Sequence, residues 1–232
     1  TYDGTRPSVT INQAVGQADP ANASPVSFTA VFSEAVSGFT GTDGIFEAER
    51  GLVGVMATGH DISSATRDLG KRLRREPLPA FTNQPDPDRK LTIGLLSGTL
   101  KTHPVGWLTV AGFEALDPHA FRLAGLVQND NPGDAITRRY RAIASEWIEV
   151  DTLDDLAVAR RAREAGIDVL IDLGGYGDAS RMTACAHRLA PVQIKWVGMQ
   201  NHSTGLAEMD WFITDGWETP PGFEPLYSEQ LL

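Results

Sequence analysis

The sequence contains little cysteine and little basic charge. Cys185 is the single cysteine among 232 residues, which excludes a disulfide within the chain and a cysteine-based metal cluster. Twenty lysines and arginines stand against thirty aspartates and glutamates, giving a formal net charge of −10. A nucleic-acid-binding surface needs a basic stripe, so we expect no nucleic acid among the partners. The scarcity of cysteine is typical of the reducing cytoplasm.

Long apolar runs and clustered histidines are also missing. No stretch reaches the roughly 20 apolar residues of a membrane-spanning helix, and the polar segment Thr1–Thr10 is unlike a signal peptide. The five histidines are scattered without zinc-ligand spacing, so the sequence predicts no metal site. The chain starts at Thr1 rather than at methionine and stops at Leu232 directly after a strong local pattern. We therefore expect it to be a fragment of a longer protein.

Residues 1–43 carry the alternating pattern of β-strands. Polar and apolar residues alternate over Ser8–Ile11 and again over Ser27–Phe32, and Asp19-Pro20 and Ser24-Pro25 mark turns between them. This pattern predicts two short strands. Two strands cannot close a sandwich core by themselves, so we expect this segment to be weakly ordered or to lean on another part of the protein.

Residues 44–86 change to helical spacing and then to prolines. Apolar and small residues recur at helical intervals from Ile62 to Leu73 behind Asp61, a residue type that caps helices. The basic residues of this stretch form a solvated face or, alternatively, an anion-binding patch, and the solvated face is the commoner arrangement. They are Arg67, Lys71, Arg72, Arg74 and Arg75. The prolines from 77 to 87 predict an extended linker.

From Leu91 onward, apolar strand runs alternate with helical patterns. The strand runs are Leu91–Leu96, Phe121–Val127, Trp147–Val150, Val169–Leu173, Val192–Val197 and Trp211–Ile213. The helical patterns are a face shared by Ile136, Tyr140 and Ile143, a capping box of Thr152 with Asp155, and the helical spacing from Met182 to Leu189. Strands with little alternation, separated by helices, indicate a parallel sheet covered on both faces. The fold class is therefore α/β, a Rossmann-like doubly wound sheet of about six strands, preceded by a short β segment and a helix.

Polar residues follow three of these strands. His103 lies in the turn Ser97–Pro104, a glycine-containing turn spans Asp172–Gly177, and a polar loop spans Gly198–Gly205. Parallel strands share one direction, so the three turns open on the same edge of the sheet, where α/β proteins place their active sites. A histidine at this edge can take or give a proton near neutral pH. The convergence of the turns, more than any one of them, makes this edge the candidate site.

Each of these signals also has a purely structural interpretation. A single loop histidine is more often a surface residue than a base. Gly174 and Gly175 are typical of a tight strand-to-helix turn, and no third glycine follows to complete a dinucleotide-binding fingerprint. The sequence also contains no Gly-x-Ser-x-Gly elbow and no phosphate-binding loop with its lysine.

Several ordered blocks nevertheless carry a family resemblance. They are Pro87–Ser97 continued by His103-Pro104-Val105, Ala165–Tyr176, Arg188–Gly198 continued by Ser203-Thr204-Gly205, Met209–Asp215, and Tyr227–Leu231. Together they make the region from about Pro85 to Leu232 resemble the N-terminal catalytic lobe of the O-linked N-acetylglucosamine transferases, the SPINDLY-like glycosyltransferases of GT-B fold. Through Pro7–Gln13, Asp19–Pro25 and Phe32–Phe39, residues 1–43 resemble a truncated bacterial immunoglobulin-like repeat. The implied division is 1–43, an immunoglobulin-like segment; 44–86, a helical segment and proline-rich linker; and 87–232, the Rossmann-like lobe.

The resemblance implies an inverting transfer of N-acetylglucosamine from UDP-GlcNAc to Ser or Thr hydroxyls of proteins, without a metal or another cofactor. His103 matches the family's active-site histidine and would orient or deprotonate the acceptor. The other residues that would shape the acceptor or sugar pocket are Pro104, Gly174, Gly175, Tyr176, Thr204 and Gly205. In the family, most contacts to uridine diphosphate come from a second, C-terminal lobe. The implied partners are therefore UDP-GlcNAc, a protein acceptor and that lobe, without which we expect no activity.

Three departures from the family pattern fall on the rim of the implied site. Thr99-Leu100 replaces Asp-Phe, Met199–His202 replaces Tyr-Pro-Gly, and Gly177 replaces a threonine. A different acceptor, or even a different activity, would account for them, and two other functions stay open. One is a non-catalytic surface or interaction protein based on the immunoglobulin-like segment, and the other is a nucleotide-binding module without transfer activity. SPINDLY-like transferases are mainly intracellular, which favours a cytoplasmic location, whereas an immunoglobulin-like segment favours export.

Overall fold

The chain divides into two compact units, Thr1–Asp43 and Gly44–Leu232. The structure is a computed structural model that describes residues 9–13, 28–32, 45–48, 51–54, 59–73, 75–76, 78–86, 88–177, 181–198 and 202–232. In the first unit, β1 (Val9–Gln13) pairs antiparallel with β2 (Phe28–Phe32), which confirms the two predicted strands. The resemblance of this unit to an immunoglobulin-like repeat stays a prediction.

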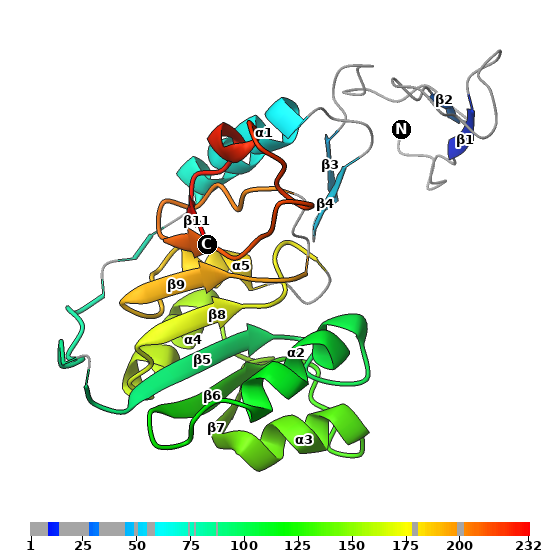
Figure 1. Cartoon of the computed structure of the whole chain (residues 1–232). Coiled ribbons are helices and arrows are strands. Elements are labelled where there is room, and N and C mark those ends of the chain that lie inside the picture. The colour runs from blue at the N-terminus through cyan, green and yellow to red at the C-terminus, as the bar shows by residue number, and fades with distance from the viewer. Residues whose placement is uncertain are drawn as a thin grey trace, which may run out of the picture. The chain divides into compact units, whose positions relative to one another are not determined.

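A seven-stranded parallel sheet forms the centre of the second unit (Figure 1). Its strands are β5 (Leu91–Ser97), β6 (Phe121–Val127), β7 (Ala144–Glu149), β8 (Val169–Asp172), β9 (Val192–Lys195), β10 (Trp211–Phe212) and β11 (Gln230–Leu231). They lie in the order β11-β10-β9-β8-β5-β6-β7, and every neighbouring pair is parallel. The predicted α/β class and parallel sheet are confirmed. The sheet exceeds the expected size because β11, with two residues, is too short to show a periodicity.

Helices cover both faces of this sheet. α2 (Pro104–Glu114) and α3 (Ala135–Ile143) lie against one face, and α4 (Asp155–Glu164) and the short α5 (Met182–Cys185) lie against the other (Figure 1). Adjacent strand residues divide between the two cores. Leu95 belongs to the core that contains α2 and α3 residues, and Leu96 belongs to the core that contains α4 and α5 residues. Both strand faces are therefore apolar, which is why the strands read as continuous apolar runs.

Two helix ends differ from the sequence prediction. Asp154, not Thr152, is the N-cap of α4, and its side chain accepts a hydrogen bond from the Ala157 N–H at 2.7 Å. The helical spacing from Met182 predicted a longer helix than α5, which ends at Cys185. The chain turns away soon afterwards because Arg188 adopts a left-handed φ of 55°, a conformation that cannot continue a right-handed helix.

The segment that precedes the sheet contains more than the predicted helix and linker. It begins with an antiparallel pair, β3 (Ile45–Ala48) and β4 (Gly51–Gly54), which the helical spacing did not indicate. The predicted helix is α1 (Gly59–Arg72), and its Leu69 packs against the core that contains α4. In the linker, the Asn83 side chain donates to Asp168 Oδ1 at 2.6 Å, which holds the linker against the amino end of β8.

Candidate functional site

The order of the sheet reverses at β5. From β5 the chain moves outward to β6 and β7, and β8, β9, β10 and β11 then extend the sheet on the other side of β5. Leu96 in β5 lies opposite Asp172, the last residue of β8. In open α/β sheets, ligands bind at such a switch point, outside the carboxyl ends of the strands. The turns that leave β5 and β8 there carry His103 and Gly174–Tyr176.

His103 is the N-cap residue of α2. Its Nδ1 accepts a hydrogen bond from the Val105 N–H at 3.2 Å, and Pro104 occupies the first helical position, where no N–H donor is required. The half-buried ring has its Nδ1 lone pair occupied in this way, so the neutral ring carries its proton on Nε2. His103 therefore presents a hydrogen-bond donor at the switch point.

The turn before His103 is fixed by its own hydrogen bonds and by α3. Ser97 Oγ accepts from the Thr99 N–H at 3.0 Å, and Asp134 Oδ1 accepts from the Thr102 N–H at 2.9 Å. Leu100 is 2% exposed and packs in the core that contains α2 and α3 residues. Its carbonyl accepts from Thr137 Oγ1 at 2.9 Å. Of the departure Thr99-Leu100, Leu100 supplies a core side chain, and the Thr99 hydroxyl lies 3.0 Å from Ser97 Oγ within the turn.

Asp134 should titrate far below an ordinary aspartate. Hydrogen bonds from Thr102, Thr137 and Ile136 lower the pKa of Asp134 from 3.8 to about 2. Because the folded pKa is depressed, the stabilisation is complete above the unfolded value and is lost as the pH falls towards 2. We expect the amide resonances of Thr102 and Thr137 to titrate together with a midpoint near 2. The Asp134→Asn variant, which retains a capping side chain, should lack this titration, and a wild-type midpoint near 3.8 would contradict the assignment.

The turn after β8 connects two of the predicted site segments. Gly175 has a φ of 58° and donates its N–H to Asp172 Oδ2 at 2.7 Å. Tyr176 is buried, donates its hydroxyl to the Thr204 carbonyl at 2.6 Å, and stacks on His202 with 6.3 Å between ring centroids. Burial raises the pKa of Tyr176 well above its usual value. Tyr176 therefore acts as a protonated donor that ties this turn to the loop containing Thr204.

Thr204 is held by hydrogen bonds to a buried carboxylate. Its backbone N–H donates to Glu229 Oε1 at 2.7 Å, and its hydroxyl donates to the same oxygen. Ser203 Oγ donates to Glu229 Oε2 at 2.7 Å. Sequence reasoning did not single out Glu229, although it lies in the family-like block Tyr227–Leu231. Glu229 is the acidic residue of that block, and its place there is the sequence feature that could have indicated it.

Gly205 lies directly against α1. It has a φ of 70°, and a Cβ at this position would lie 2.2 Å from the Thr66 carbonyl carbon. A Cβ on Gly70 would in turn lie 2.2 Å from the Gly205 carbonyl oxygen. The Ser63 hydroxyl also donates to the Leu226 carbonyl. α1 thus contacts the loop backbone to backbone at Gly205, next to the buried Thr204.

The predicted site residues thus form two groups. Gly175 and Tyr176 are joined to Thr204 through the hydrogen bond of the tyrosine hydroxyl, and Gly174 lies in the same turn. The hydrogen bonds of His103 instead run to the first turn of α2, to Val105 and Trp107. The two groups follow β5 and β8, which are paired neighbours in the sheet.

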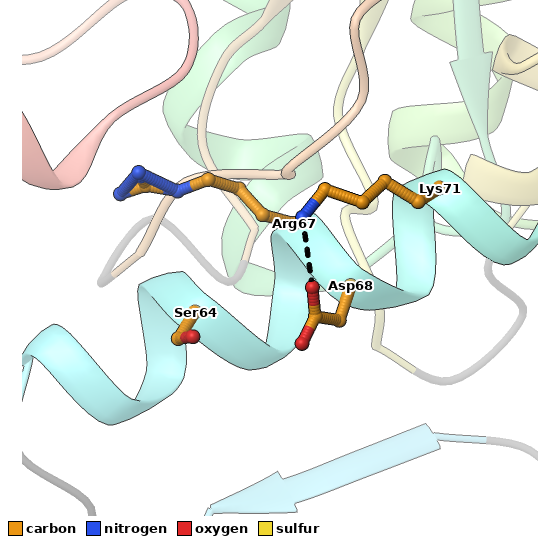
Figure 2. A pocket seen from close by; sticks show the side chains of 4 residues that line it. All are labelled: Ser64, Arg67, Asp68 and Lys71. Carbon is orange, nitrogen blue, oxygen red and sulfur yellow. Dashed lines mark hydrogen bonds and ion pairs between the residues drawn. The ribbon is translucent and has the colours of Figure 1, made fainter.

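Three basic residues of α1 and of the segment after it have acidic or carbonyl partners, namely Arg67, Lys71 and Arg75. Figure 2 shows a hollow on α1 lined by Ser64, Arg67, Asp68 and Lys71, in which Lys71 Nζ lies 3.0 Å from Asp68 Oδ1 while Arg67 extends away from this pair. Arg67 donates to the Leu226 carbonyl at 3.1 Å, and Arg75 pairs with Glu208. This arrangement agrees with a solvated face rather than an anion-binding patch. The hollow includes none of the predicted site residues.

Neither a metal site nor a membrane-spanning helix is found among the residues that the structure describes. Within them, no three His, Cys, Asp or Glu side chains are grouped so that they could hold a metal ion. None of the helices in the described part of the chain has the length and apolar character needed to cross a membrane.

The fold and the site together define a class of protein. A doubly wound parallel sheet with polar turns at its switch point is a Rossmann-like α/β lobe of the kind that binds nucleotide-containing ligands at its carboxyl edge. The chain belongs to glycosyl transferase family 41, whose family model matches residues 68–232. The resemblance found in the sequence blocks is confirmed.

Known relatives show the same family. Two curated relatives, each described as a probable UDP-N-acetylglucosamine–peptide N-acetylglucosaminyltransferase SPINDLY, come from Petunia hybrida and Arabidopsis thaliana. They are 30% and 31% identical over 174 residues, which cover 72% of this chain. A solved structure of an O-GlcNAc transferase mutant from Thermobaculum terrenum aligns with a TM-score of 0.69 and 35% identity over 77% of this chain. The chain spans 18% and 19% of the two curated relatives and 34% of the solved chain.

Proposed function

We propose that this chain is the acceptor-side lobe of an enzyme that transfers N-acetylglucosamine from UDP-GlcNAc to Ser or Thr hydroxyls of proteins in the cytoplasm. The observation that carries the proposal is the place of His103. A histidine that belongs to the family-like blocks stands at the switch point between β5 and β8, in a chain that matches family 41. The names of the relatives indicate the donor and the peptide acceptor.

The chemistry assigned to this lobe is an inverting displacement. The acceptor oxygen attacks the anomeric carbon from the face opposite the diphosphate, the bond from that carbon to the diphosphate oxygen breaks, and the hydroxyl proton leaves to a base. The Val105 hydrogen bond holds His103 in the tautomer that is protonated on Nε2. We therefore assign His103 to orient the acceptor oxygen through Nε2–H rather than to remove its proton.

The departing diphosphate requires positive electrostatic potential. Helix N-termini and basic side chains can supply it without a metal ion, and we assign these groups to a second lobe. This assignment fits the chain's formal net charge of −10 and the acidic or carbonyl partners of Arg67, Lys71 and Arg75.

A chimera tests this function. The chain is fused to the region that follows the matched segment in the Thermobaculum terrenum enzyme, and transfer is measured as radiolabelled GlcNAc incorporated into a Ser/Thr peptide. We expect transfer by the chimera and none by the 232-residue chain alone. We also expect a rate that is insensitive to EDTA and a product with inverted anomeric configuration.

Two outcomes would contradict the proposal. Robust transfer by the chain alone would place the whole donor site within these residues and remove the need for a second lobe. A folded chimera that binds uridine diphosphate in a calorimetric titration but glycosylates no peptide would instead favour a nucleotide-binding module without transfer activity.

A further inference from the structure

A buried ion pair joins the ends of two neighbouring strands beneath the candidate site. Asp172 ends β8, Lys195 ends β9, and the two residues are partners in the parallel register. Lys195 Nζ lies 3.7 Å from Asp172 Oδ2, and each side chain is 1% exposed. Burial raises the pKa of Asp172 and lowers that of Lys195, and the opposite charge of each residue counteracts the shift of the other.

Each member of the pair also holds the turn that follows its own strand. Asp172 Oδ2 accepts the Gly175 N–H at 2.7 Å. Lys195 Nζ donates to the Trp196 carbonyl at 3.2 Å and to the Val197 carbonyl. The pair therefore links the Gly174–Tyr176 turn to the start of the loop that leads to Thr204.

The turn held by Lys195 has a strained backbone. Val197 has a φ of 46°, a left-handed conformation that is a genuine outlier for a β-branched residue. Gly198 follows with a φ of 50°, and a Cβ there would lie 2.3 Å from the Leu173 carbonyl oxygen. The two turns thus touch backbone to backbone. Strain of this kind persists only where its surroundings hold it, and it is concentrated at functional sites.

Stability alone gives a weak reason for such a pair. Two buried charges lose their hydration, and replacing a buried ion pair with apolar residues of similar volume is often neutral or stabilising. Lys195 lies four residues before Met199, the first residue of the departure Met199–His202, which favours a local role. The other titratable groups whose charges act on Lys195 are Cys185 and Glu229, and neither replaces Asp172 as its ion-pair partner.

We propose that Asp172 and Lys195 are positioning residues that fix the Gly174–Tyr176 turn and the Val197–Gly198 turn relative to each other, so that both present their groups correctly to the acceptor. Neither side chain touches substrate, because both are enclosed. The relative position of the two turns does not depend on the proposed transfer activity. Only its effect on the acceptor rests on that activity.

The test compares Lys195→Met with the breaking of a second ion pair, next to the amino end of β8. Arg89→Met breaks the ion pair of Arg89 with Asp168, which lies at the amino end of the strand. We expect Lys195→Met to move the ¹H–¹⁵N amide resonances of Gly175 and Gly198 and, in the chimera, to raise the KM for the acceptor about tenfold or more with a smaller effect on kcat. Arg89→Met should leave these amides and the acceptor KM at wild-type values.

Two further variants separate positioning from folding. Asp172→Asn combined with Lys195→Met removes both buried charges and should fold, yet the Gly198 amide should still be displaced because methionine has no N–H donor. Adding Val197→Gly to Lys195→Met should return the Gly198 amide towards its wild-type position, because glycine adopts a positive φ without strain.

Failure of this inference can be distinguished from failure of the proposed function. If Lys195→Met weakens folding but leaves the Gly175 and Gly198 amides and the acceptor KM unchanged, the pair is only structural and the inference is overturned. Equal effects from Arg89→Met would overturn it as well. If the wild-type chimera transfers nothing, the proposed function fails, while the amide resonances of the 232-residue chain still decide the positioning role.

Discussion

Replacement of His103 by alanine is expected to lower kcat for transfer in the chimera by at least ~100-fold. The ring follows β5 at the switch point with β8, and in the proposed mechanism its Nε2–H holds the acceptor oxygen. Its loss leaves the acceptor hydroxyl without that hydrogen bond in the transition state. Initial rates of GlcNAc incorporation at saturating donor and peptide measure the effect.

A second substitution separates this role from helix capping, because His103 also caps α2. Loss of a cap costs about 1 kcal/mol, so reduced folding could lower the activity of the alanine variant. Asparagine is a good N-cap residue but does not reproduce the imidazole Nε2–H. His103→Asn should therefore retain stability and lose activity, while alanine at the exposed His119, before the amino end of β6, should change neither. Near-normal kcat in a folded His103→Asn enzyme would reject the role.

Replacement of Gly205 by alanine is expected to lower the free energy of unfolding by about 3 kcal/mol or more, through left-handed strain and backbone overlap. The added methyl would lie 2.2 Å from backbone atoms of Thr66 in α1, and neither segment can yield by a side-chain rotation. α1 must then move off the loop that carries Thr204. Urea unfolding followed by far-UV circular dichroism measures the loss.

Another glycine provides a control substitution that is expected to change stability in the opposite direction. Gly112 lies in α2, and a Cβ there would meet no atom within 4 Å. Gly112→Ala should therefore raise stability by about 0.5–1 kcal/mol, because alanine is the better helix former. A Gly205→Ala protein within 1 kcal/mol of wild type by the same assay would show that α1 does not pack as closely as described.

Much of the lobe could be predicted from local patterns. The runs that begin at Leu91, Phe121 and Val169 are apolar on both faces, and this pattern can be recognised in the sequence without knowledge of tertiary contacts. The turn that carries His103 could be placed for the same reason, because the direction of parallel strands fixes the edge at which their ends meet. The resemblance of the sequence blocks to the family then singled out His103 within that turn.

The remaining features depend on contacts between distant parts of the chain. Lysine is rarely buried, so nothing local places Lys195 inside the lobe. Its burial follows from pairing with Asp172 on the neighbouring strand. The position of Gly205 against α1 likewise depends on a helix far earlier in the chain. Glu229 precedes the two-residue β11, which is too short to predict.

The contact between α1 and Gly205 also limits where a truncated form of this protein can begin. Leu206 is fully buried, and Leu69 and Leu73 of the preceding segment pack against the same core. The family match accordingly begins inside α1, at residue 68. A truncation that started at β5 would remove α1 and expose Leu206 and the core around it to water. The stretch between α1 and β5 therefore connects two parts of the same compact unit.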